Sequence, residues 1–307
     1  MTTFFDIPEV VIDYVRTVFA QANEKVSRIL TDHPSMHEEM LDQTLITELS
    51  TSPAAFFAQE QAAVLIESHW LGGRRMYGRW EIADIALFIM LRQKGRLAQR
   101  KVALLQTKRL YSREITVHQL DESDYLIGIG RLADRTDALV PLGSQRTFSF
   151  SDSCVYGAMH AGAEQIDRID KYAEEKAIPI FYAFYNPVEL PYSATYPAPR
   201  GQGARSPNTL GCRVQPATEV HNRVSAIPAG QTPSFSALRS AEPVRSDDLF
   251  AASGWRLETF VADEVLRCRQ GALFDKNSDE NLDSLFYRRS APIAAAIAVT
   301  IDLDGND

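Results

Sequence analysis

The segment IPIFYAFYNP, residues 178–187, constrains the fold of this chain more than any other. It carries no charge and consists almost wholly of apolar and aromatic residues, a composition typical of a strand buried on both faces. An amphipathic helix is predicted just before it, over 151–177, and strands are predicted over 62–73, 79–91 and 101–110. Strands followed by a helix and then a buried strand predict an α/β protein whose mixed sheet is flanked by helices.

The N-terminal part of the chain favours helices. Apolar residues recur at helical spacing over 8–31, which predicts an amphipathic helix. A second helix is predicted over 36–50, with Ser35 as its N-cap. We expect a short helical piece within 53–61, and we interpret 112–152 as an insertion.

The C-terminal third differs in composition. Nine of the fifteen prolines lie between residues 187 and 243, which indicates a long functional loop or a partly disordered segment. A helix closed by Gly271 is predicted over 253–271, and a final strand over 291–304. We therefore divide the chain into a core of residues 1–190, with an N-terminal helix, and an extension of residues 191–307 that packs on this core.

The net charge of −8 argues against a nucleic-acid-binding protein, but the charge is unevenly distributed. Residues 74–113 hold eleven basic and two acidic residues, so this segment carries +9 and the remaining chain −17. A basic segment in an acidic protein is typical of a site for a polyanion, although it is also compatible with a solvated hairpin. The nucleic-acid-binding candidates within it are Arg92, Lys94, Arg96, Arg100, Lys101 and Arg109.

Other features limit where the protein acts. The three cysteines are isolated and form no CxxC pair, which argues against a disulfide framework and against a structural zinc site. The absence of an 18-residue apolar run argues against a membrane span, and acidic residues near the N-terminus argue against a signal peptide. We expect a cytoplasmic protein that does not interact with a membrane.

A carboxylate, an amide and an ammonium group are predicted to converge in the basic segment. Asp84 lies within an apolar strand, where a carboxylate is costly unless it binds a metal or a hydrogen-bond donor. Gln106 and Lys108 are two residues apart on the next strand, so their side chains share a face, and a hairpin would bring that face beside Asp84.

These groups match the needs of a Mg²⁺ or Mn²⁺ site. Mg²⁺ prefers oxygen ligands and keeps several waters. Asp84, the Gln106 amide oxygen and the Thr107 carbonyl would supply the protein ligands, and Lys108 would stabilise charge that builds up on a phosphate. The alternative is a structural ion pair between Asp84 and Arg79 or Lys108.

In the order of its elements and in the run LLQTKRL, the chain resembles the PD-(D/E)xK restriction-endonuclease-like nucleases, in particular the QxK variant of Mrr-like and phage-defence nucleases. The resemblance covers roughly residues 36–190. It implies a restriction-endonuclease-like fold, with catalytic roles for Asp84, Gln106 and Lys108 and for a helical glutamate, Glu38 or Glu39. Glu67 on the first strand is a further candidate, and the alternative role for Glu38 is that of a capping residue. Two departures are a missing proline before Asp84 and the long spacing of 22 residues between Asp84 and Gln106.

The function that this resemblance implies is Mg²⁺-dependent endonuclease activity on nucleic acid, with double-stranded DNA as the expected substrate and antiviral defence or restriction as the expected role. A homodimer or a partner protein of a defence system is also expected. The alternative function is a non-catalytic subunit that binds nucleic acid, or docks a partner, through a degenerate nuclease fold.

Overall fold

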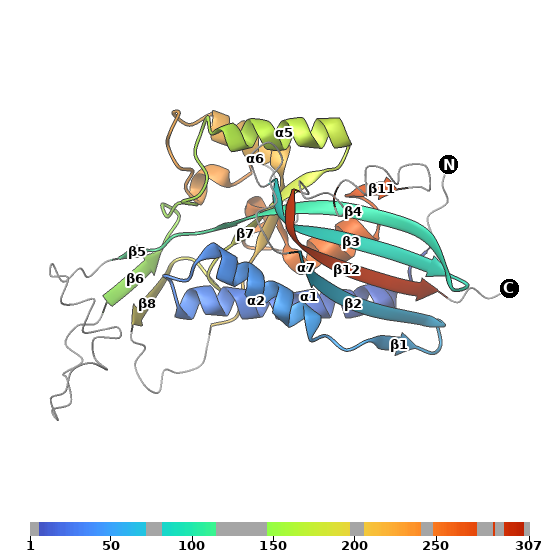
Figure 1. Ribbon diagram of the computed structural model, residues 1–307. Coiled ribbons are helices and arrows are strands. Elements are labelled where there is room, and N and C mark those ends of the chain that lie inside the picture. The colour runs from blue at the N-terminus through green and yellow to red at the C-terminus, as the bar shows by residue number, and fades with distance from the viewer. Residues whose placement is uncertain are drawn as a thin grey trace, which may run out of the picture.

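The computed structural model describes residues 6–71, 82–114, 146–196, 206–240, 248–274, 285 and 292–303. A nine-stranded mixed sheet runs through it, with helices packed on both faces (Figure 1). The predicted α/β class, with a mixed sheet flanked by helices, is confirmed.

The large sheet draws strands from the whole chain. In spatial order they are β1 (Ala55–Phe57), β2 (Ala62–Trp70), β12 (Ile293–Leu303), β3 (Ala83–Gln93), β4 (Arg96–Arg109), β7 (Ile180–Tyr185), β9 (Arg213–Pro216) and β10 (Trp255–Arg256), and β11 (Ala272–Phe274) pairs with the first part of β4. The pairs β12–β3 and β4–β7 are parallel, and the other pairs are antiparallel. A second, three-stranded sheet is made of β5 (Arg113–Glu114), β6 (Arg146–Phe150) and β8 (Tyr192–Tyr196).

Helices α1 (Glu9–Asp32) and α2 (Glu38–Ser50) cover one face of the large sheet, and α5 (Glu164–Lys176) and α6 (Ala217–Ser225) lie on the other (Figure 1). The apolar stripe predicted over 8–31 is the buried side of α1. The prediction of Ser35 as the cap of the second helix is wrong, because α2 starts later, with His37 in the N-cap position and no side-chain cap bond.

Strands β3 and β4 form the long hairpin that the sequence predicts. Their turn is confined to Lys94 and Gly95, both with positive φ, so the strands extend into residues 92–100, which the predicted strands 79–91 and 101–110 left out. Strand β2 does not pair with this hairpin, although it precedes β3 in the chain, because β12 lies between β2 and β3 and pairs with both. The small side chains of β12 suit this central place, where Ala295, Ala296 and Ala298 are buried.

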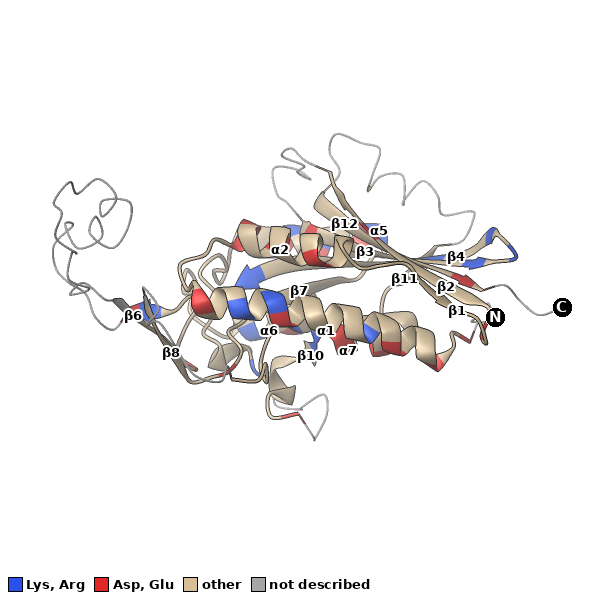
Figure 2. Ribbon diagram, turned by 90° about the horizontal axis from the view of Figure 1, so that it is seen from below, with Lys and Arg blue, Asp and Glu red and all other residues tan. Residues whose placement is uncertain are grey.

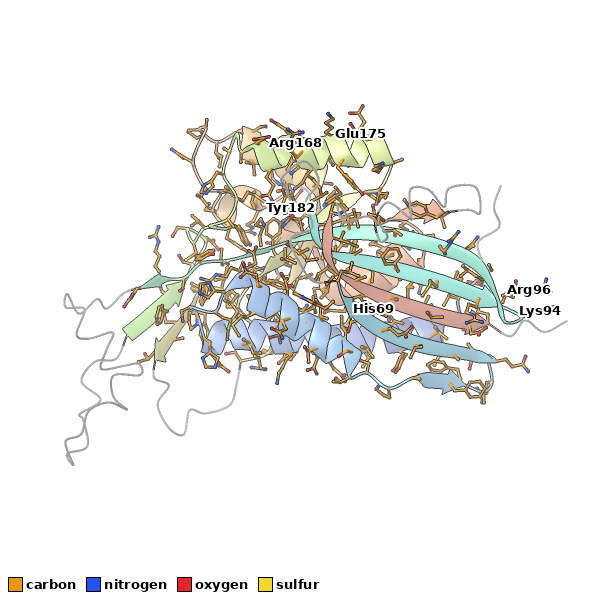
Figure 3. All side chains as sticks on the ribbon, in the orientation of Figure 1. His69, Lys94, Arg96, Arg168, Glu175 and Tyr182 are labelled. Carbon is orange, nitrogen blue, oxygen red and sulfur yellow. The ribbon has the colours of Figure 1, made fainter. Side chains whose placement is uncertain are left out.

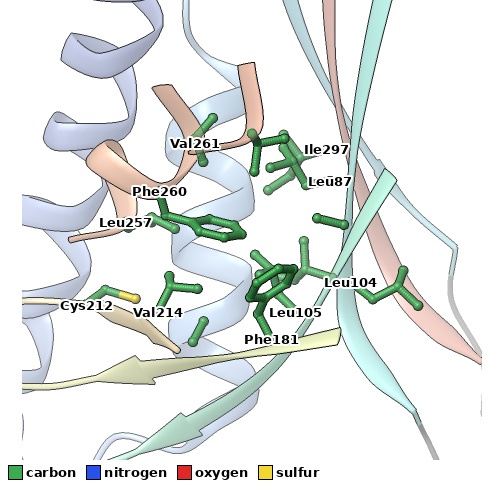
Figure 4. Close-up of a cluster of buried hydrophobic side chains, with 14 of the residues drawn as sticks. Leu87, Leu104, Leu105, Phe181, Cys212, Val214, Leu257, Phe260, Val261 and Ile297 are labelled. Atoms are coloured by element: carbon green, nitrogen blue, oxygen red, sulfur yellow. The ribbon is translucent and has the colours of Figure 1, made fainter. Parts of the chain in front are cut away.

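Strand β7 is buried at all six positions, as predicted for a strand covered on both faces. The ring of Phe181 on this strand packs against Phe260, with ring centroids 4.7 Å apart (Figure 4). Phe260 begins η3 (Phe260–Leu266), a π-helix that follows the single turn α7 (Leu257–Thr259). The core therefore joins the central strands to a segment about 80 residues further along the chain.

Three local predictions are wrong. Residues 151–163 are not helical: Val155 bridges to Tyr111 and to Ser234, and a Cβ on Gly157 would lie 2.8 Å from the ring of Tyr111. The segment 53–61 contributes the edge strand β1 and a turn instead of a helix. The helix predicted over 253–271 forms only over residues 257–266, as α7 and η3; the prediction is wrong for its start, where β10 lies, and for its end, because η3 stops before Gly271.

Residues 191–307, predicted to pack on the core, supply β9, β10, β11 and β12 to the large sheet itself. Within the Pro-rich segment the structure describes β8, β9, α6 and the 3₁₀ turn η1 (Ser236–Leu238), and a second such turn, η2 (Ala251–Ser253), follows it. Most of the predicted insertion, residues 115–145, lies outside the described residues.

Candidate functional site

The candidate site lies where β4 extends past the start of β3. The N–H groups of β4 alternate in direction, and the N–H of Leu104 points towards β7, where it donates to Pro179 O. The N–H groups of Thr107 and Arg109 therefore point to the other side, past Ile85 and Leu105, the last residues that pair β3 with β4 at this end. Carboxylates take the place of a strand there: Asp84 Oδ2 accepts from Thr107 N at 2.6 Å, and Glu38 Oε2 accepts from Arg109 N at 2.9 Å.

Asp84 is beside Gln106, because Ile85 pairs with Leu105 in the hairpin. The Asp84 Oδ2 atom accepts three hydrogen bonds, from Gln106 Nε2 at 2.5 Å, from Thr107 N and from Thr107 Oγ1 at 2.9 Å. The long spacing between Asp84 and Gln106 is thus accommodated by the length of the hairpin.

Lys108 is buried between its own strand and α2. Its Nζ donates to Thr107 O at 2.7 Å and lies 3.5 Å from Glu38 Oε1. Glu38 is the first residue of α2, where a negative charge is favoured by the helix dipole. Of the carboxylates left open by the sequence, Glu38 thus contacts Lys108, while Glu39 is exposed beside the site.

Glu67 is not brought to this site. Glu67 on β2 pairs with Ala298 on β12, and Ala298 pairs with Phe88 on β3. Phe88 is four residues along β3 from Asp84, and β2 is two strands from β3. At about 3.3 Å per residue and about 4.8 Å per strand, that places Glu67 more than 10 Å from Asp84.

Burial makes the charged forms of these carboxyl groups costly. It raises the pKa of Asp84 and of Glu38, and the ammonium of Lys108 opposes the rise at both. The charge of Asp84 further raises the pKa of Glu38, and the charge of Glu39 raises that of Asp84. A cation bound here would therefore relieve an unfavourable accumulation of negative charge.

Asp42 and Tyr185 belong to the same cluster but were not predicted from the sequence. Asp42 is buried on α2, and its pKa is held well above the usual range by desolvation and by the charge of Asp84. Its Oδ2 lies 3.0 Å from Thr107 Oγ1, and its Oδ1 accepts from the Tyr185 hydroxyl at 2.7 Å. The spacing of four residues from Glu38, along the buried side of the predicted helix, was the available signal.

The residues present fit a Mg²⁺ or Mn²⁺ ion. Gln106 is buried and its Oε1 has no hydrogen-bond partner within the described part of the chain, so a hard acceptor is left unsatisfied next to Asp84. Asp84, Gln106 Oε1 and Glu38 would hold the ion, together with water. The Thr107 carbonyl, which the sequence offered as a further ligand, instead accepts the Lys108 ammonium. Among the described residues, no group of three or more His, Cys, Asp or Glu side chains is placed to hold a metal ion, so the proposed ligand set depends on the amide oxygen of Gln106.

The six predicted nucleic-acid-binding residues separate into two groups. Lys101 and Arg109 are buried: Lys101 Nζ donates to Val265 O at 2.9 Å, and the Arg109 guanidinium donates to Pro34 O and Met36 O. These two side chains stabilise the fold. Lys101 joins β4 to η3, and Arg109 joins β4 to the turn that precedes Glu38.

The other four, Arg92, Lys94, Arg96 and Arg100, lie on the distal part of the β3–β4 hairpin. In Figure 2 the tip of this hairpin is blue, the colour of Lys and Arg. Figure 3 shows Lys94 and Arg96 at the tip, far from Tyr182. Tyr182 pairs with Gln106 on the neighbouring strand, so it marks the position of the site. Eight residues of extended strand separate Arg92 from Asp84, which corresponds to about 26 Å. Arg79, the alternative partner of Asp84, lies outside the described residues.

Comparisons with known proteins do not assign the chain to a family. A scan against family models, a search of curated proteins and a search of solved structures each found no match. Within the described segments, no helix combines the length and the apolar character needed to cross a bilayer.

Proposed function

We propose that this protein is a metal-dependent endonuclease that hydrolyses phosphodiester bonds in double-stranded DNA, using Mg²⁺ or Mn²⁺. The observation that carries the proposal is the buried Oε1 of Gln106, which has no hydrogen-bond partner among the residues that the structure describes. It lies next to Asp84 and two residues before Lys108 on the same strand. An acceptor left open in this position costs stability unless a cation or a water occupies it.

The order of the elements also supports the proposal. Helix α2 with Glu38, then β2, β3 with Asp84, β4 with Gln106 and Lys108, α5 and the parallel strand β7 follow one another in the order that the restriction-endonuclease-like resemblance implies. The insertion of β12 between β2 and β3 is an additional feature of this chain. A role in restriction or antiviral defence is part of the same proposal.

Each side chain has a distinct task in this mechanism. A bound ion supplies Lewis acidity and a water of lowered pKa. Asp84, Gln106 and Glu38 would hold the ion at the start of β3. The Lys108 ammonium, fixed by Thr107 O and Glu38, stabilises negative charge that develops on the phosphate.

The second candidate function is a non-catalytic nucleic-acid-binding or partner-docking subunit. It is favoured by the burial of Lys108, whose side chain is only 4% exposed and which already contacts Glu38 and the Thr107 carbonyl. In that case the cluster stabilises the fold, and binding is left to the basic hairpin.

Cleavage of plasmid DNA separates the two candidates. Purified protein is incubated with Mg²⁺, with Mn²⁺ or with EDTA, next to the Asp84→Asn variant and the matched surface variant Asp13→Asn on α1. The nuclease is expected to cut with either metal, to stop in EDTA and to be inactive only as Asp84→Asn. Cleavage by Asp84→Asn at the wild-type rate would exclude the assigned site, and DNA binding without any cleavage would favour the second candidate.

A further inference from the structure

Thr107 lies between two carboxyl groups and has too few hydrogens for both. Its Oγ1 is 2.9 Å from Asp84 Oδ2 and 3.0 Å from Asp42 Oδ2, both within hydrogen-bond distance. A threonine hydroxyl carries one hydrogen and can donate only one such bond. The second contact needs a hydrogen from elsewhere.

Asp84 is the carboxylate that receives the threonine hydrogen. Its Oδ2 already accepts from the backbone N–H of Thr107 and from the amide of Gln106, so all three contacts are directed towards an acceptor. The ammonium of Lys108 further favours the ionised form of this carboxylate.

Asp42 occupies the opposite position. It is buried on the inner side of α2, and its Oδ1 accepts from the Tyr185 hydroxyl, which is itself fully enclosed. Its hydrogen-bond partners within the described part of the chain are the hydroxyls of Tyr185 and Thr107, and neither carries a positive charge. Desolvation and the nearby charge of Asp84 both raise the pKa of Asp42.

We propose that Asp42 is a positioning residue that donates its carboxyl hydrogen to Thr107 Oγ1, so that Thr107 can donate its own hydrogen to Asp84 Oδ2. The chain of bonds runs from Tyr185 on β7, through Asp42 on α2 and Thr107 on β4, to Asp84 on β3. Through the hydroxyl of Thr107, this chain of bonds fixes the orientation of the Asp84 carboxylate. Its significance for metal binding rests on the proposed function, whereas the direction of the hydrogen bonds does not.

An asparagine reproduces a protonated aspartic acid at this position. In the Asp42→Asn variant the side-chain NH₂ group would donate to Thr107 Oγ1, and the amide oxygen would accept from Tyr185. Alanine would remove both bonds. Asp42→Asn and Asp42→Ala therefore distinguish a donor at this position from an ionised carboxylate, which asparagine could not replace.

The experiment compares wild-type protein with Asp42→Asn, Asp42→Ala, Thr107→Ser, Thr107→Val and the exposed α2 control Gln43→Ala. The first measurement is the urea midpoint at pH 7 without metal. Asp42→Asn and Gln43→Ala should unfold at or above the wild-type midpoint, and Thr107→Ser slightly below it because a buried methyl group is lost. Asp42→Ala and Thr107→Val should unfold earlier than Thr107→Ser. The proposal is overturned if Asp42→Asn unfolds as early as Asp42→Ala.

The second measurement is the binding of Mn²⁺ alone, followed by electron paramagnetic resonance. Loss of a residue that orients a ligand typically costs about 10- to 100-fold in metal affinity, and we expect this for Asp42→Ala but not for Asp42→Asn. If Asp42→Asn loses Mn²⁺ as completely as Asp84→Asn, Asp42 is itself an ionised ligand and the proposal fails. If wild-type protein binds no Mn²⁺ and cuts no DNA, the proposed function fails, while the urea midpoints still decide the role of Asp42.

Discussion

Replacing Lys108 with methionine should destabilise the protein in a pH-dependent manner. The Lys108 ammonium is 3.5 Å from Glu38 Oε1, and at an effective dielectric constant of about 20 this attraction amounts to about 5 kcal/mol. The desolvation of both groups offsets part of it. The charged hydrogen bond to Thr107 O, of a kind that contributes about 1.5–3 kcal/mol, is lost as well. We expect a net loss of about 3 kcal/mol in the free energy of unfolding at pH 8.

The sign of the pH dependence follows from Glu38. Burial raises its pKa in the folded protein, so this group costs stability as the pH rises from the ordinary carboxyl range through the raised pKa. Lys108 limits that rise, and its removal raises the pKa of Glu38 further. The variant should therefore differ less from wild type at the acidic end of the pH range, where a larger share of Glu38 is protonated, and most near pH 8.

The assay is urea unfolding of the metal-free protein between pH 5 and pH 8, with Lys171→Met as the matched control. Lys171 forms an exposed ion pair with Glu175 at 3.6 Å, and pairs of this kind contribute less than about 1 kcal/mol. A loss of stability in Lys108→Met that is independent of pH would refute the assigned coupling to Glu38. In the nuclease assay the same variant should lose about 100- to 1,000-fold in rate at saturating metal, and a wild-type rate would refute the role of Lys108 in catalysis.

Three further predictions concern neighbouring groups. Gln106→Glu replaces the amide that donates to Asp84 with a second carboxylate, so it should lower the melting temperature of the metal-free protein. Added Mn²⁺ should raise the melting temperature of this variant by more than that of wild type, as measured by calorimetry. An equal rise in both proteins would argue against Gln106 as a ligand. Neutralising Arg92, Lys94 and Arg96 should reduce the slope of DNA affinity against salt concentration by about one unit per lost phosphate contact. Mn²⁺ binding should stay unchanged, because the hairpin tip is about 26 Å from Asp84. An unchanged slope would mean that the tip does not contact DNA. Arg109→Met should lower the free energy of unfolding by about 1–3 kcal/mol, because the carbonyls of Pro34 and Met36 lose their donor. The salt dependence of DNA binding should not change. A weaker salt dependence would indicate that Arg109 contacts DNA.

The sequence pattern was sufficient to predict those elements whose residues are stabilised by contacts within a short segment of the chain. The stripe of α1, the apolar runs of β3 and β4 and the uniformly apolar β7 each reflect the burial of neighbouring residues in one element. The approach of Asp84 to Gln106 was predictable for the same reason, because a hairpin fixes its own register. The candidate site was thus found from three short segments, although not in full.

Tertiary structure decided what depends on distant partners. The position of β12 between β2 and β3 is set by pairing across more than 200 residues, and its nearly continuous run of apolar residues fits any central strand. Residues 151–163 contain apolar positions at helical spacing, yet contacts with Tyr111 and Ser234 hold them as an irregular segment. Charge alone could not show that Arg109 and Lys101 are enclosed while Arg92 and Arg96 are exposed. Asp42 illustrates the same limit: a polar residue on a helix is ordinary by sequence, and only the assembly of α2, β4 and β7 around Thr107 places it, buried and hydrogen-bonded, behind Asp84.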